Sequence, residues 1–151
     1  MLENIGHELY KSLIYDKRYM YILTGLKNTL IISLFAVIIG FLLGTIIALI
    51  NDSNEKNGNF KILSTLGRWY VNVIRGTPML LQLMIIYYVI FKSVDISPVL
   101  VGIIAFGLNS SAYVSEIIKS GINSVDTLQY ESALSLGFNY SKTMIYVILP
   151  Q

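Results

Sequence analysis

The feature that most constrains this chain is a long apolar stretch without a charged residue. It runs from Leu30 to Ile50, which is 21 residues. A helix rises about 1.5 Å per residue, so this stretch covers roughly the 30 Å of a bilayer's hydrocarbon core. The sequence therefore predicts a transmembrane helix over residues 30–50, within an all-α membrane protein.

The composition agrees with a membrane protein. Hydrophobic residues make up 54% of the chain and charged residues only 13%, against about 25% charged residues in soluble proteins. The net charge of +2 is too small to favour nucleic-acid binding. The chain has no cysteine and one histidine, His7, so we expect neither a disulfide framework nor a histidine metal cluster, and no cofactor.

Two further spans are expected after the first. Pro78 can open a helix over residues 77–94, since a proline needs no N–H in the first turn of a helix. Ser97 and Pro98 are a cap and a first-turn proline for a third span, residues 98–118. The polar residues 51–58 predict a turn. Residues 1–22 mix charges, leucines and tyrosines, which is typical of an amphipathic helix in the membrane interface.

Small residues form a stripe along the first span. Gly40 and Gly44 are four residues apart, and Ala36 and Ala48 extend the spacing. Such stripes let helix backbones pack closely in lipid. The stripe can serve a contact with another helix of this chain or of a second copy, or it can be a chance run of small residues.

Polar groups inside the later spans are candidates for a transport path. Asn109, Tyr113, Glu116 and Ser120 lie at offsets 0, 4, 7 and 11, on one face of a helix. Polar groups at such depth face protein or water rather than lipid. Glu116 can instead lie at the membrane interface. For Gln82 in the second span, a helix–helix hydrogen bond is favoured over direct substrate contact.

The last segment, residues 124–150, predicts two short helices with a bend. Asp126 can cap the first helix, with Gln129 completing a capping box. Gly137 suits the left-handed position after the helix end. Asn139 or Ser141 can cap the second helix, and a proline ends the segment.

This segment resembles the EAA loop of the membrane subunits of bacterial ATP-binding-cassette importers. The resemblance rests on Glu131-Ser132-Ala133, then Gly137, then Ile148-Leu149-Pro150. The family has Ala where this chain has Ser132. The resemblance implies a cytoplasmic coupling helix that docks on the ATP-hydrolysing subunit. It would do so through Glu131, Ser132, Ala133, Gly137, Leu149 and Pro150.

Other stretches are similar to the polar amino-acid branch of these importers. They are Gly25–Leu30, Tyr70–Gln82 with the branch motif Arg75-Gly76-Thr77-Pro78, Leu108–Ile118 and Ile122–Val125. Asp126 departs from the family, which usually has Pro there. Together the matches predict a permease domain over residues 23–151.

The resemblance implies a permease subunit of an ATP-driven amino-acid importer, multi-pass in the bacterial cytoplasmic membrane, with its N-terminus outside. Its expected partners are a cytoplasmic ATP-binding subunit, a second identical or different permease subunit, and an external amino-acid-binding protein. We expect Gln82, Asn109, Tyr113 and Glu116 to line the path. The chain has no phosphate-binding Gly-x-x-x-x-Gly-Lys-Ser/Thr loop, so ATP hydrolysis is expected in the partner and no catalytic residue here.

Family members continue past the Leu-Pro-Gln at Gln151 with further membrane helices. We therefore expect this chain to be part of a longer protein and not to transport by itself. One alternative is a small membrane adaptor that assembles through the Gly40/Gly44 stripe. Another is an intramembrane enzyme, which the lack of a nucleophile–base pair within the spans disfavours.

Overall fold

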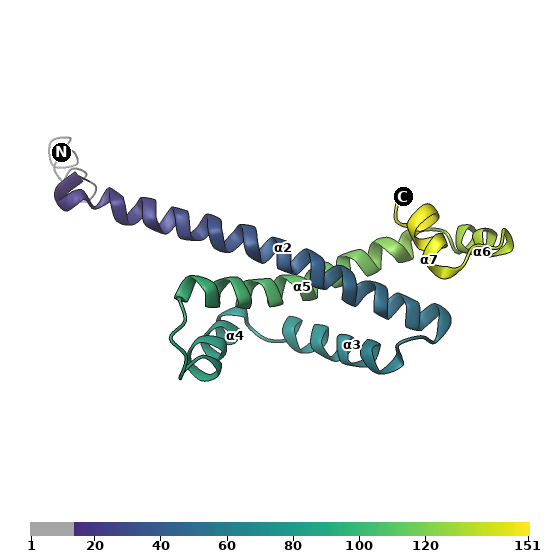
Figure 1. The fold of residues 1–151 in the computed structure, drawn as a ribbon, viewed down its shortest axis with the longest axis horizontal. Helices are drawn as coiled ribbons and strands as arrows, with labels where there is room; N and C mark the ends of the chain where they lie inside the picture. Colours follow the sequence, from purple (N-terminus) through teal and green to yellow (C-terminus); the bar gives the residue numbers. More distant parts are fainter. Residues whose placement is uncertain (1–13) are drawn as a thin grey trace.

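The computed structural model describes residues 14–151, and this part of the chain consists of helices and turns without a strand (Figure 1). The predicted all-α fold is confirmed. The elements are a 3-10 turn at Tyr15–Lys17, α2 (Tyr19–Asn57), α3 (Lys61–Arg75), α4 (Met79–Ile85) with a π-helical turn η3 (Ile86–Ile90), α5 (Pro98–Ser124), α6 (Thr127–Ser135), and α7 (Tyr140–Thr143) with a π-helical turn η4 (Met144–Ile148).

The two long helices, α2 and α5, pack directly on each other through small residues. A methyl group added at Gly40 would lie 2.6 Å from the Ser110 hydroxyl oxygen. One added at Gly44 would lie 2.7 Å from the backbone oxygen of Ser111. Both distances are shorter than any van der Waals contact. The two helix backbones therefore lie closer together than a residue with a side chain would allow. The small-residue stripe therefore serves packing within the chain.

Helices α2 and α5 run in the same direction. Ile32 lies against Gly102, Ile39 against Gly107 and Gly40 against Ser110, so residue numbers rise together along both helices. Parallel neighbours require the chain to return between them, and α3 with α4 makes that return (Figure 1). The return is bent by 108° between Lys61–Arg75 and Met79–Ile90.

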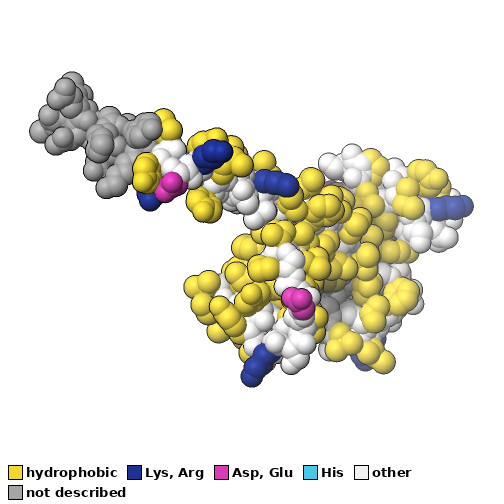
Figure 2. All heavy atoms as spheres, turned by 60° about the vertical axis from the view of Figure 1, so that its left-hand side comes forward, with side chains coloured by type: hydrophobic (Ala, Val, Ile, Leu, Met, Phe, Trp, Pro, Cys, Tyr) yellow, Lys and Arg dark blue, Asp and Glu magenta, His cyan; other side chains and the backbone are white. Residues whose placement is uncertain are grey.

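Within residues 14–151, two helical segments are long and apolar enough to cross a membrane, Tyr15–Asn57 and Pro98–Ser124. The bent pair α3 and α4 makes a third if it counts as one crossing. The helix inside the predicted span 77–94 ends at Ile90. It is too short to cross alone, because a spanning helix needs about 17–25 residues. Hydrophobic side chains cover most of the face in Figure 2, as expected for a surface toward lipid or other membrane helices.

The predicted turn over residues 51–58 is wrong. Helix α2 continues to Asn57 and ends at Gly58, which has a φ of 70° and donates its N–H to Asn54 at 2.9 Å. The start of that stretch is buried, including Asn51 and Asp52. Asn51, Asp52 and Ser53 face other parts of the protein instead of water, so they do not end the helix, and only the last residues of the stretch are exposed.

The predicted interfacial segment, residues 1–22, is described only in part. Residues 1–13 lie outside the described part of the chain. Residues from Tyr19 onward already belong to α2. The first long helix thus begins well before the uncharged stretch that identified it.

Candidate functional site

Gln82 lies at the bend between α3 and α4 and ties that bend to α5. Its side-chain Nε2 donates to the backbone oxygen of Ile74 and to the Thr77 hydroxyl, both at 2.7 Å. Its Oε1 accepts a hydrogen bond of 3.1 Å from Asn109 Nδ2 on α5. Gln82 therefore makes the helix–helix hydrogen bond that the sequence favoured. The Arg-Gly-Thr-Pro motif also has a structural role, because the hydrogen bond between Gln82 and the Thr77 hydroxyl closes the bend.

Arg75, the first residue of that motif, meets two residues of α5. Its guanidinium forms an ion pair of 2.9 Å with the Glu116 carboxylate. Its guanidinium carbon lies 5.6 Å from the centroid of the Tyr113 ring, within the range of a cation–π contact. The two charged side chains are 41% and 46% exposed, so this pair remains open to a ligand or a neighbouring chain.

These contacts join all four predicted path residues to the bend, and we call the set the polar belt. It consists of Arg75, Gln82, Asn109, Tyr113 and Glu116. Within it, Asn109 and Tyr113 also line a groove of about 620 Å³ between α2 and α5, whereas Gln82 and Glu116 do not. Three members of the predicted helical face on α5, Asn109, Tyr113 and Glu116, contact the bend. The fourth, Ser120, takes part neither in these contacts nor in the groove.

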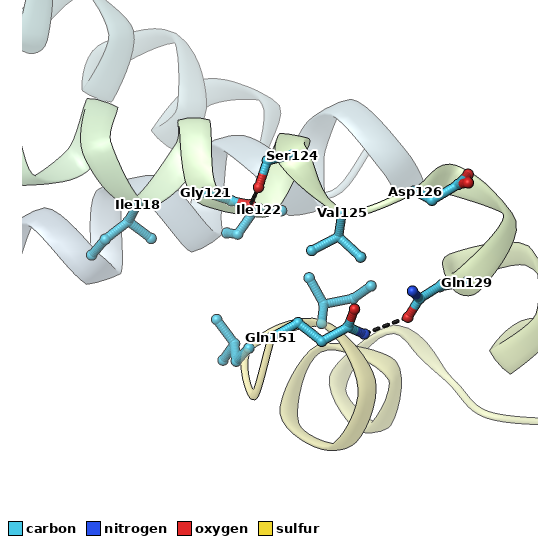
Figure 3. Close-up of a pocket in the computed structure, with 10 residues that line it drawn as sticks. Ile118, Gly121, Ile122, Ser124, Val125, Asp126, Gln129 and Gln151 are labelled. Carbon is cyan, nitrogen blue, oxygen red and sulfur yellow. Dashed lines mark hydrogen bonds between the residues drawn. The ribbon is translucent and has the colours of Figure 1, made fainter.

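The second candidate region is the segment 126–151, which we call the coupling segment. Its two short helices begin at side-chain caps, as the sequence predicted. Asp126 Oδ1 accepts from the Leu128 N–H at 2.9 Å, and Asn139 Oδ1 accepts from the Lys142 N–H at 3.0 Å. Gln129 does not complete a capping box toward Asp126, because its side-chain oxygen accepts from the Gln151 amide (Figure 3).

Gly137 makes the bend between those helices. Its φ is 85°, a conformation that costs an L-residue with a side chain about 1–2 kcal/mol. The Gly137 N–H bonds the Leu134 oxygen at 2.9 Å, and the Phe138 N–H bonds the Ala133 oxygen at 3.1 Å. This pair of bonds is a Schellman motif, so the predicted role of the glycine is confirmed in its geometry.

The outer face of the coupling segment is exposed and partly apolar. Five of the six predicted coupling residues are exposed: Glu131, Ser132, Gly137, Leu149 and Pro150. Ala133 is 3% exposed and packs inward. Leu128 and Leu136 are 64% and 79% exposed, and Glu131 forms no ion pair within residues 14–151. A rigid exposed surface of leucines beside a carboxylate suits docking of another protein.

The inner face of the coupling segment rests on both long helices. Ile122 of α5, with Met144 and Ile148 of η4, forms a buried apolar cluster that Leu49 of α2 joins. Beside it, the end of α5, the start of α6 and η4 line an open pocket of about 470 Å³ (Figure 3).

A polar contact accompanies this apolar cluster. The Tyr140 hydroxyl donates to Asp52 Oδ2 of α2 at 2.8 Å. Burial and the neighbouring Asp52 carboxylate raise the pKa of Tyr140. The phenol is neutral at physiological pH, as an ordinary tyrosine is, and can donate its proton to Asp52. Its contribution to stability is present below the ordinary tyrosine pKa of about 10 and is lost only in stronger alkali.

Sequence reasoning missed Asp52, because residues 51–58 were assigned to a polar turn. The available signal was Lys56 four residues later, a spacing that pairs charges on a helix. The structure has that ion pair, at 2.8 Å.

Comparison with known proteins agrees with the predicted family. The family described as Binding-protein-dependent transport system inner membrane component matches residues 40–151. This chain belongs to that family. The chain is also 41% identical over 133 residues to the arginine transport system permease protein ArtQ of Bacillus subtilis strain 168, a match that covers 87% of this chain.

A solved structure has the same fold as this chain. A crystal structure of an amino acid ABC transporter with histidines matches with a TM-score of 0.69 and 38% identity over 85% of this chain. The chain spans 58% of the length of ArtQ and 63% of the length of the crystallised chain. ArtQ is named as a permease protein of a transport system, and the crystallised protein as an amino acid ABC transporter.

Proposed function

We propose that this chain is the permease part of an ATP-driven amino-acid importer in the bacterial cytoplasmic membrane. Its family membership and the amino-acid transport named for its relatives support this proposal. The adaptor alternative needs the stripe at Gly40 and Gly44 to be free for a second copy. That stripe is covered by α5 of the same chain, so the permease is the better explanation.

The parallel course of α2 and α5 supports a multi-pass arrangement. If both helices cross the bilayer in one direction, the α3–α4 pair must cross in the other. The N-terminus and the coupling segment then lie on opposite sides of the membrane. With the coupling segment in the cytoplasm, where the ATP-binding subunit is, the N-terminus faces outward, toward an amino-acid-binding protein.

The observation that carries the proposal is the form of the coupling segment. Two side-chain caps and a Schellman motif fix its backbone, while Glu131 and the neighbouring leucines point outward. A preformed backbone lowers the entropy that docking costs. We assign the docking of a cytoplasmic ATPase to this surface, including Glu131, Ser132, Gly137, Leu149 and Pro150.

The polar belt is the proposed lining of the transport path, completed by a second permease subunit. An amino acid carries an ammonium and a carboxylate, and the half-exposed pair of Arg75 and Glu116 presents one partner for each. Asn109 and Tyr113 supply hydrogen-bonding groups in the adjacent groove. Gln82 positions Asn109 and the bend.

The test is capture of the ATPase by the detergent-solubilised complete permease that carries this chain. Wild type is compared with Glu131→Arg and Gly137→Trp, and with Asp95→Arg, a matched charge reversal at an exposed loop residue before α5. We expect wild type and Asp95→Arg to retain one ATPase, and the other two variants to lose it. A wild type that captures no ATPase refutes the proposed function, and capture by Glu131→Arg refutes the assigned docking surface.

A further inference from the structure

Asp52 is a carboxylate buried where α2 meets the coupling segment. The residue is 1% exposed. Its Oδ1 lies 2.8 Å from the Lys56 ammonium, and its Oδ2 accepts the Tyr140 hydroxyl hydrogen bond at 2.8 Å. A buried carboxylate without such partners costs several kcal/mol. Burial of the Asp52 carboxylate therefore favours the arrangement in which Lys56 and Tyr140 both stay in contact with it.

Lys56 extends the contact to α6. Its ammonium lies 4.8 Å from the centroid of the Tyr130 ring, a cation–π distance. Through Tyr130 and Tyr140, both short helices of the coupling segment reach the same turn of α2. We call Asp52, Lys56, Tyr130 and Tyr140 the tyrosine clasp.

The clasp differs from the link between the coupling segment and α5. Helix α5 ends at Ser124 and leads through two residues into α6, so α5 follows the coupling segment by covalent connection. Helix α2 has no such connection and is reached by side-chain contacts. Of these, the apolar contact through Leu49 can slide, whereas a hydrogen bond to a buried carboxylate requires one geometry.

We propose that Tyr140 and Asp52 are positioning residues that transmit displacement of the coupling segment to α2. The inference rests on the proposed docking of an ATPase to that segment. When the ATPase moves the segment, the clasp makes α2 move with α5. The close packing between α2 and α5 is then kept, and the groove containing Asn109 and Tyr113 moves as a unit.

The experiment uses the complete importer in proteoliposomes with its ATPase and binding protein. Tyr140→Phe removes the hydroxyl and keeps the ring. Its matched control is Tyr146→Phe, the same change in the same segment at a side chain that is 70% exposed. The readout is the number of amino acids transported per ATP hydrolysed, measured beside ATPase capture and thermal stability.

We expect Tyr140→Phe to retain ATPase capture and ATP hydrolysis while the transport ratio falls about tenfold, the factor expected for loss of a hydrogen bond to a charged group. Tyr146→Phe should keep the wild-type ratio. Asp52→Asn retains an acceptor for the hydroxyl and should restore most of the ratio relative to Asp52→Leu. A merely structural role would lower stability and capture without changing the ratio.

Asp52→Leu removes the carboxylate acceptor from α2 and leaves the Tyr140 hydroxyl only the longer contact of 3.4 Å to the Leu49 backbone oxygen. It serves as the second variant if Tyr140→Phe does not assemble. If either variant transports as many amino acids per ATP hydrolysed as wild type, the inference is wrong. Absence of ATPase capture by wild type overturns the proposed function instead, so the two failures are distinguishable.

Discussion

The seam between α2 and α5 and the coupling segment achieve a defined shape by opposite means. In the seam, Gly40 and Gly44 lie against the backbone and side chains of α5 with no room for a methyl group. In the coupling segment, Leu128 and Leu136 remain largely exposed, and the backbone is fixed by caps and by Gly137. The seam is shaped by what it packs against, and the coupling segment by its own local bonds.

This difference separates the consequences of substitution. A larger residue in the seam must displace a helix, so it affects folding. A change on the outer face of the coupling segment removes surface that the fold does not use, so it affects a partner. The folding side of this difference can be measured at four places, from the largest expected effect on stability to the smallest, and the partner side is measured by the ATPase capture of Glu131→Arg.

The largest effect is expected for Gly44→Leu. A Cβ at this position lies 2.7 Å from the Ser111 backbone oxygen and 2.8 Å from Val114. Overpacking of this kind costs about 3 kcal/mol or more, so little monodisperse protein should be recovered in detergent. Gly25→Leu in the same helix is the control, because nothing lies within 4 Å of its added Cβ. Equal recovery of the two variants would contradict the close seam.

A smaller loss is expected for Gly137→Ala. The φ of 85° at this position makes any side chain unfavourable, by about 1–2 kcal/mol. Gly121→Ala is the matched control in α5, where an added Cβ meets nothing within 4 Å. That control should gain up to about 1 kcal/mol, since Ala favours a helix over Gly. Thermal unfolding in detergent should thus shift in opposite directions, and parallel shifts would show that the turn has another conformation.

Removing the side-chain cap of α7 should lower the free energy of unfolding by less than Gly137→Ala does. Asn139→Ala deletes the oxygen that accepts the Lys142 N–H at 3.0 Å, a loss of about 1 kcal/mol. Ser141→Ala tests the other cap that the sequence allowed, and it should change stability by less than about 0.5 kcal/mol. Hydrogen exchange of the α7 amides is the measurement. Faster exchange in the serine variant alone would assign the cap to Ser141.

The smallest effect on stability is expected at the polar belt. Arg75 and Glu116 are both partly exposed, so their ion pair contributes about 0.5 kcal/mol. A double-mutant cycle with Arg75→Ala and Glu116→Ala in detergent measures the coupling. A coupling free energy of several kcal/mol would show that this ion pair is as tightly packed as the seam between α2 and α5, and is not an exposed pair.

Local features of the structure were predictable from sequence, because their causes are local. The uncharged stretch 30–50 lies inside α2. The caps at Ser97, Asp126 and Asn139 each bond an N–H two or three residues away. Gly137 has the predicted left-handed φ. In each case the deciding group lies within one helical turn of the position that it controls.

The features that escaped prediction depend on distant residues. The composition of residues 51–58 predicts a turn, but Asp52 is buried against Tyr140, which lies 88 residues away. The short second span depends on the bend that Gln82 closes with Ile74 and ties to Asn109. The role of the glycine stripe stayed open for the same reason, since the residues that cover it are in α5. No local pattern encodes these partners.

Helix α2 has a further consequence through its length. Its 39 residues make an unbroken rod of about 58 Å, nearly twice the thickness of a bilayer core of about 30 Å. The rod acts as a lever, because a tilt of about 5° about one end carries the other end sideways by roughly 5 Å. The clasp lies within the last two turns of this rod. A tilt of about 5° about the clasp is therefore enough to displace the other end of α2 by roughly the width of a side chain.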